Sequence, residues 1–149
     1  MLLLTPKPDE EETSEIKEFD LGVIGMGPSG LTASIYASRA SIKVVCIGKD
    51  YGGQMGLALE IENYPGFDSI SGIELTDKMR EQAEKFGTKI VYGEISTIKK
   101  TEDNLFLIKS DMGTYKAKAL ILATGGRHRE LGVPGEKEFI GKGVSYCAT

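Results

Sequence analysis

Three glycines with the spacing Gly-x-Gly-x-x-Gly, in the segment Gly25–Gly30, constrain the fold of this chain more than any other feature. An apolar run, Phe19–Ile24, comes directly before them and predicts a buried strand. The segment Pro28–Ala40 has a proline suited to a first helical turn and helical periodicity after it. A β-branched run, Lys43–Ile47, predicts a second buried strand. Two buried strands joined through a helix are most simply parallel, so we expect a βαβ unit.

In a strand–turn–helix of this type each glycine has a separate role. Gly25 permits the tight turn, Gly27 lets a pyrophosphate approach the backbone, and Gly30 lets the helix pack against the strand. The helix N-terminus, which begins with Pro28 and Ser29, offers the unpaired N–H groups that follow the proline and a partial positive charge to phosphate groups. We therefore predict that the unit binds the ADP portion of a nucleotide cofactor. A P-loop is excluded for this turn, because no Gly-Lys-Ser/Thr follows.

One part of such a site is missing from the sequence. An acidic residue is expected at the end of the second strand, about 20 residues after the glycines, where it binds a ribose hydroxyl. Gly48 occupies that position and is followed by Lys49 and Asp50. Either Asp50 substitutes for the acid, or backbone groups and water bind the ribose.

The rest of the chain predicts an α/β fold with a parallel sheet. The stretch Gly48–Gly72 is glycine-rich and has no sustained period, which indicates a long ordered loop of the kind that is usually functional. Ser71 and Glu74 have the spacing of a capping box at the start of a helix, Ile73–Phe86. Strand-like runs then occur at Thr88–Val91, Ile95–Lys99, Leu105–Lys109, Thr114–Ala117 and Ala119–Ala123. Turn-forming residues separate the later runs, so we predict a β-meander.

The loop Asp50–Gly66 has the chemistry of a site for a flat ring. It contains Gly52-Gly53-Gln54 and Asn63-Tyr64-Pro65-Gly66. Bare backbone beside amide side chains suits a heteroaromatic ring with donors and acceptors along one edge. An irregular structural loop is the alternative.

Charge and cysteine content exclude several other classes of protein. The chain has 149 residues, enough for one domain with a core, and only two cysteines, too few for a disulfide scaffold. Its net charge of −4 resides in residues 1–18, and the remainder is balanced, so no basic stripe indicates binding to nucleic acid. We expect residues 1–18 to be an acidic flexible extension.

The apolar and metal-binding patterns lead to further expectations. The longest early apolar run, Leu2–Leu4, is too short for a membrane span or a signal sequence, so we expect a cytoplasmic protein without membrane association. Cysteine, histidine and acidic residues nowhere have the spacing of metal ligands, so no metal site is predicted.

Six segments, taken in order, resemble the amino-terminal part of the low-molecular-weight thioredoxin reductases, which are two-domain flavoprotein disulfide reductases. They are Gly25–Gly30, Gly52–Gln54, Glu62–Gly66, Ala123–Gly125, Val133–Glu136 and Gly143–Thr149. The resemblance implies a Rossmann-like FAD-binding domain with a parallel sheet and a β-meander crossover, of the two-domain flavoprotein type and truncated. It places the first segment of that domain at residues 19–131, with its carboxyl-terminal segment missing. Residues 132–149 would be the connection and the start of an NAD(P)H-binding domain.

The resemblance further implies FAD as the cofactor and NAD(P)H as the electron donor. The glycines of the turn would lie along the pyrophosphate, Gln54 and Asn63 near the flavin ring, and Thr124 near the adenosine half. The full set of implied cofactor-binding residues is Gly25, Gly27, Pro28, Ser29, Gly30, Gly52, Gly53, Gln54, Asn63, Ala123, Thr124 and Gly125.

Cys147 matches the first cysteine of the Cys-Ala-Thr-Cys motif of this family, and is the predicted catalytic residue. In the family, NADPH reduces FAD, the flavin reduces the disulfide of that motif, and the dithiol reduces thioredoxin. The sequence stops at Thr149, before the second cysteine, so we expect an inactive amino-terminal fragment of a parent enzyme that is a homodimer. Cys46 lies within a predicted strand and is expected to be a packed, inert thiol.

Two other functions remain open at this point. The parent could be a ferredoxin–NADP reductase or NADH oxidase of the thioredoxin-reductase type, which works without a dithiol. Cys147 within Tyr-Cys-Ala-Thr argues against that function. The chain could also be a short nucleotide-binding module without catalysis.

Overall fold

The computed structural model describes residues 16–146, and within them the predicted βαβ unit is present. Strand β1 (Lys17–Ile24) leads through the glycine turn into helix α1 (Pro28–Arg39), which is followed by strand β2 (Val44–Gly48). The two strands pair in parallel, with Leu21 beside Val44. Strand β1 begins two residues before the predicted start, because Lys17 and Glu18 extend its pairing with a later strand. The parallel pairing expected from the sequence is therefore confirmed.

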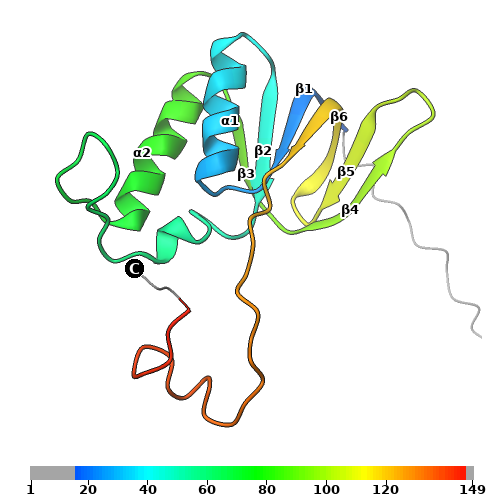
Figure 1. The fold of residues 1–149 in the computed structure, drawn as a ribbon. Helices are drawn as coiled ribbons and strands as arrows, with labels where there is room; N and C mark the ends of the chain where they lie inside the picture. The colour runs from blue at the N-terminus through cyan, green and yellow to red at the C-terminus, as the bar shows by residue number, and fades with distance from the viewer. Residues whose placement is uncertain (1–15, 147–149) are drawn as a thin grey trace, which may run out of the picture.

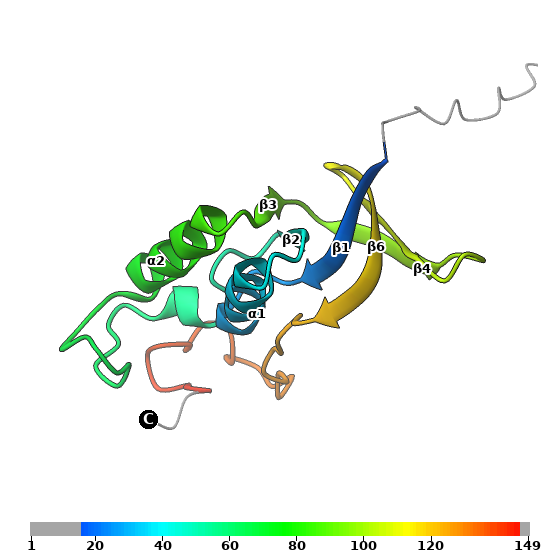
Figure 2. The same cartoon turned by 90° about the horizontal axis from the view of Figure 1, so that it is seen from above.

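The remaining elements complete one mixed sheet and a second helix. They are the 3-10 helix η1 (Met55–Leu57), helix α2 (Gly72–Lys85), and strands β3 (Lys89–Tyr92), β4 (Ile95–Lys100), β5 (Phe106–Ser110) and β6 (Gly113–Leu122). The strand order is β3-β2-β1-β6-β5-β4. Strands β3, β2, β1 and β6 run in parallel, and β6, β5 and β4 form the predicted antiparallel meander. Figures 1 and 2 show α1 and α2 together on one side of the parallel strands.

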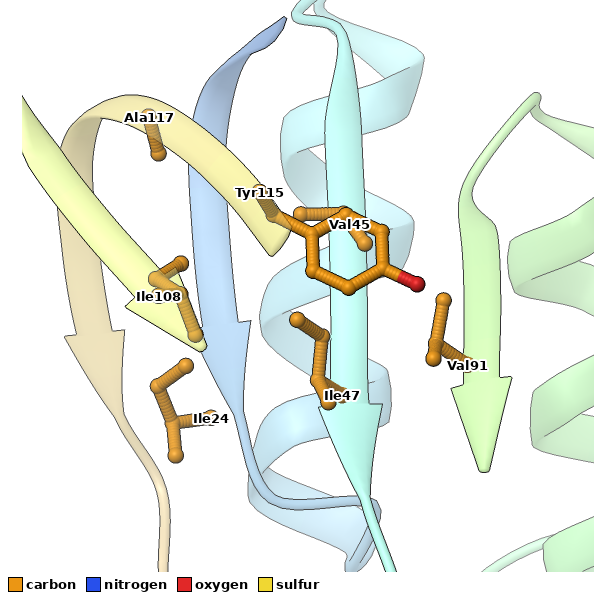
Figure 3. Packing of buried hydrophobic residues seen from close by; sticks show 7 residues of the cluster. All are labelled: Ile24, Val45, Ile47, Val91, Ile108, Tyr115 and Ala117. Atoms are coloured by element: carbon orange, nitrogen blue, oxygen red, sulfur yellow. The ribbon is translucent and has the colours of Figure 1, made fainter. Parts of the chain in front are cut away.

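Both faces of the parallel strands are buried. Successive residues of β2 point to opposite faces, and each set belongs to a different apolar cluster. Val44 and Cys46 belong to a cluster that packs against Ala37 of α1. Val45 and Ile47 belong to a second cluster, which includes Ile108, Tyr115 and Ala117 of the meander. Figure 3 shows this second cluster on the face of β2 that is turned away from α1. The meander therefore curls over the sheet and covers the face that the helices leave open.

The prediction of two separate strands, Thr114–Ala117 and Ala119–Ala123, is wrong, because the two runs form the single strand β6. It pairs with β1 from Lys17 beside Tyr115 to Ile24 beside Leu122. Its first half also pairs with β5, so that half lies between two strands. Lys118 does not interrupt the strand, since its exposed side chain forms an ion pair with Asp20. A single charged residue can continue a strand when its side chain points to solvent.

The predicted cap of helix α2 is confirmed, and the loop before this helix contains regular elements that the sequence did not predict. Ser71 is the N-cap of α2, and its hydroxyl accepts a hydrogen bond from the N–H of Glu74 at 3.2 Å. The loop Gly48–Gly72 contains η1 and an antiparallel bridge between Ile61 and Ile70. Within residues 16–146, no helix has the length and apolarity that a membrane span requires.

Candidate functional site

The carboxyl ends of the four parallel strands border one groove of about 1000 Å³. The turn after β1 forms its centre, and the loop after β2 and residues 93–95 after β3 form one side. Residues 123–128 and Glu130, which follow β6, form the other side. In an open parallel sheet this edge is where ligands bind, because the loops diverge there and leave a crevice. Figure 1 shows the chain after β6 leaving the sheet at this end and turning back in the direction of η1.

The three glycines of the turn are required for different reasons. A Cβ atom on Gly25 would lie 2.2 Å from the carbonyl oxygen of Ala123, and its φ of +113° excludes most side chains. A Cβ on Gly30 would lie 2.0 Å from the carbonyl oxygen of Gly25. Gly27 differs, since its φ is −79° and a Cβ there would meet nothing closer than 3.9 Å. The packing of the chain therefore requires glycine at positions 25 and 30. At Gly27 it leaves an open space beside the backbone, which we call the cradle.

The N-terminus of α1 faces this cradle with its donors uncapped. Gly27 is the N-cap residue, no side chain caps the helix, and its first turn holds no acidic residue. The N–H groups of a first helical turn have no acceptor within the helix, and they carry the positive end of the helix dipole. This end of α1 thus has the properties of an anion-binding site, and the open backbone of Gly27 gives access to it.

The loop after β2 is held against the turn on one side and against α2 on the other. The N–H of Gly52 donates to the carbonyl oxygen of Met26 at 3.2 Å. The hydroxyl of Tyr51 donates to Asp77, and Arg80 Nε donates to the Tyr51 oxygen at 3.2 Å. Burial, together with the bond to Asp77, raises the pKa of Tyr51 to about 12, so the phenol stays protonated.

Two ion pairs lie along the groove. Lys49 Nζ is 2.7 Å from Glu94 Oε1, and Arg127 Nη2 is 3.2 Å from Asp50 Oδ2. Hydrogen bonding to Glu94 raises the pKa of Lys49, which keeps that side chain charged. No acidic residue stands at Gly48, where a Cβ would lie 3.1 Å from the N atom of Met26. Close packing under the turn thus explains a glycine at the end of β2.

The structure brings most of the predicted cofactor-binding residues together and separates a few. Those that line the groove are Gly25, Gly27, Pro28, Ser29, Gly53, Gln54, Ala123, Thr124 and Gly125. Gly30 and Gly52 lie behind this lining and fix the backbone of the turn and the loop. Asn63 is exposed and lies outside the lining. Cys147 lies outside the described residues.

Several lining residues were not predicted from the sequence. They are Met26, Lys49, Glu94, Arg127, His128 and Glu130, among others. Lys49 and Glu94 follow the ends of β2 and β3 by one and two residues, and this position after a parallel strand could have indicated that they line the groove. Arg127 and His128 carried no such signal, because the connection after β6 has no regular structure.

The connection after β6 is organised by one buried carboxylate. Glu136 is 4% exposed, and its oxygens accept hydrogen bonds from the N–H groups of Leu131 and Gly132 at 2.8 and 2.7 Å. The hydroxyl of Tyr146 also donates to Glu136, which lowers the pKa of Glu136 and raises that of Tyr146 to about 12. The Tyr146 ring stacks on His128, with 3.6 Å between ring centroids. The residue before Cys147 is thereby attached to the wall of the groove.

Comparison with known proteins places this chain in a family. The pyridine nucleotide-disulphide oxidoreductase family model matches residues 19–149. A thioredoxin reductase of Bacillus subtilis is 46% identical over 136 residues, which are 91% of this chain and 43% of that protein. The crystal structure of thioredoxin reductase from Streptococcus pyogenes has 45% identity and a TM-score of 0.75 over 88% of this chain and 43% of its own. A thioredoxin reductase from Giardia duodenalis has 39% identity and a TM-score of 0.76, over 89% of this chain and 43% of its own.

The chain spans less than half the length of these relatives. The family model matches from Phe19, within strand β1. Fold, strand–turn–helix geometry and sequence agree on the assignment. The chain belongs to the pyridine nucleotide-disulphide oxidoreductase family and, within it, is related to the amino-terminal part of the thioredoxin reductases.

Proposed function

We propose that this chain is the FAD-binding part of a thioredoxin reductase-like flavoprotein. The observation that carries the proposal is the open cradle at Gly27, at the uncapped N-terminus of α1. A dianionic pyrophosphate matches the donors and the positive helix end at this point. The chain leaves this space free although the glycines on either side are tightly packed.

The groove also suits the two halves of FAD that flank the pyrophosphate. Gly53 and Gln54 line the groove, where they would supply bare backbone and an amide group to the flavin ring. The network from Tyr51 to Asp77 and Arg80 holds this loop in place. Thr124 and Gly125 form the opposite wall, at the end of β6, and we assign them to the adenosine half.

The parent enzyme would use this site in a redox reaction with a protein disulfide. Bound FAD would supply the electron transfer between NAD(P)H and a Cys-x-x-Cys disulfide, with Cys147 as one of its sulfurs. Reduction of thioredoxin, or of a similar small disulfide protein, would follow. A homodimeric, cytoplasmic parent belongs to the same proposal, and so does the inactivity of these 149 residues alone, which contain one cysteine of the pair.

A titration of the 149-residue chain with FAD, followed by flavin fluorescence, tests the proposal. We expect saturable binding, and much weaker binding of FMN, which lacks the ADP portion. Gly27→Ala is the decisive variant, because its methyl group has room in the free protein but occupies the cradle. It should weaken FAD binding by about tenfold or more while costing less than roughly 1 kcal/mol in stability.

Two results would overturn the proposal. One is a wild-type chain that folds but does not bind FAD. The other is an affinity for FAD that stays the same in Gly27→Ala or equals the affinity for FMN.

A further inference from the structure

The ion pair between Asp50 and Arg127 joins two sides of the groove. Asp50 follows the end of β2 by two residues, and Arg127 follows the end of β6 by five. Strands β2 and β6 lie on opposite sides of β1 in the sheet. Two strand spacings, about 10 Å, therefore separate the segments from which the two side chains reach each other. The pair therefore joins segments that lie on either side of the turn after β1.

This ion pair contributes little to the fold. The side chain of Asp50 is 63% exposed and that of Arg127 is 77% exposed. Ion pairs with this exposure are weak, because water solvates both charges and the side chains lose freedom on pairing. Both residues line the groove, so they face the space that a ligand would fill. Each side chain can therefore exchange the other for a hydrogen-bonding partner on a ligand in the groove.

The ribose acceptor expected at Gly48 is missing, and Asp50 is the best placed of the three acids that line the groove, which are Asp50, Glu94 and Glu130. Glu130 lies eight residues beyond the end of β6 and is paired with Lys137. The ribose acid expected at the end of β2 is replaced by Gly48, where the turn leaves too little room. Asp50 follows the same strand, directly beside β1. Glu94 follows β3, one strand farther from the turn, and is bound to Lys49 at the shorter distance of 2.7 Å. Compared with Glu94, Asp50 thus follows a strand nearer to the glycine turn, and its ion pair is longer.

We propose that Asp50 and Arg127 are cofactor-binding residues that exchange their mutual ion pair for contacts with the ADP portion. Asp50 accepts hydrogen bonds from the ribose hydroxyls, and Arg127 donates to the pyrophosphate. A carboxylate accepts two donors, as a vicinal diol requires, and a guanidinium matches phosphate oxygens with its fork of N–H groups. The inference rests on the proposed function, because it needs the ADP portion to bind in this groove.

Calorimetric titration of the full chain with ADP and with 2′,3′-dideoxy-ADP tests the part of Asp50. Wild type should bind ADP about tenfold more tightly than 2′,3′-dideoxy-ADP, since hydrogen bonds to a charged group are stronger than those between neutral groups. In Asp50→Asn this preference for the hydroxyls should fall to about threefold or less. Glu94→Gln and Asp20→Asn are matched controls, because each removes the acid of another exposed ion pair. Both should keep the preference.

Titration with ADP and with adenosine tests the part of Arg127. Arg127→Gln should reduce the preference for ADP over adenosine by about fivefold or more and make ADP binding less sensitive to salt. Its preference for ribose hydroxyls should stay unchanged.

The result can separate this inference from the proposed function. Wild type that binds neither FAD nor ADP overturns both. Binding of FAD with the hydroxyl preference intact in Asp50→Asn, or lost in Glu94→Gln instead, overturns the exchange and leaves the proposed function standing. An unchanged preference for ADP over adenosine in Arg127→Gln has the same meaning.

Discussion

At the scale of single residues, burial decides the chemistry of Cys46. Its side chain is fully buried in β2, and its sulfur donates to the carbonyl oxygen of Gly25 at 3.5 Å. Loss of solvation disfavours the thiolate and raises the pKa of Cys46 to about 11. The sequence predicted a packed, inert thiol at this position, and the structure confirms the packing. Cys46 therefore serves the core beneath the glycine turn.

We expect iodoacetamide at about pH 8 to leave Cys46 unmodified in the folded chain, because roughly one thiol in a thousand is then ionised. The same reagent should modify it in guanidinium chloride, and peptide mass spectrometry distinguishes the two results. A raised pKa also means that the unfolded chain loses its proton first as the pH rises. Stability should therefore fall between about pH 9 and 11, and less so in Cys46→Ala. Rapid native modification of Cys46 would contradict this account.

At the scale of elements, local signals located the helices and strands, with their ends within two residues of the observed ones, but not the continuity of β6. The proline at Pro28 and the capping pair Ser71 and Glu74 place both helix starts within one residue of the observed ones. Strand β6 was predicted as two runs, because its pairing on both sides cannot be inferred from its own residues. The connection after β6 has no periodic pattern, so the burial of Glu136 was not predictable from the sequence.

Glu136 should control the local order of the connection between β6 and Tyr146. Glu136→Ala removes the acceptor of the Leu131 and Gly132 N–H groups, so hydrogen exchange of these amides should accelerate by about tenfold. Glu138→Ala, which changes an exposed acid nearby, is the control and should leave it unchanged.

The pH dependence of this exchange provides a second readout. Because the pKa of Glu136 is lowered in the folded chain, its contribution is present above about pH 4.5 and is lost as the pH falls. Equal protection of the two amides in wild type and Glu136→Ala would show that the carboxylate does not hold the connection.

At the scale of the whole molecule, two layers cover the parallel strands, and the meander is one of them. Ile108 of β5 is fully buried in the cluster with Val45 and Ile47. A Cβ on Gly22 of β1 would lie 2.9 Å from the Ile108 Cδ1 atom, so the glycine makes room for this contact. The meander is thus packed against the strands that carry the groove, and its integrity supports their positions.

Ile108→Ala should destabilise the chain by about 3 kcal/mol, because a buried cavity remains where the side chain is removed. Denaturant unfolding measures this change. Ile98→Ala, on the exposed strand β4, removes the same atoms from a side chain that is 37% exposed and should cost much less. Similar losses in the two variants would mean that the meander does not pack on the sheet as described.

The glycine turn, its flanking strands and helix, and the capped start of α2 follow from the order of residues alone. Each depends on backbone sterics and on periodic burial within a few residues of the chain. The groove wall is different, because Asp50 and Arg127 are 77 residues apart and meet only through the strand order that places β2 and β6 on either side of β1. Tertiary structure alone decides which charges face each other there, since side chains far apart in sequence become neighbours only when the sheet is assembled.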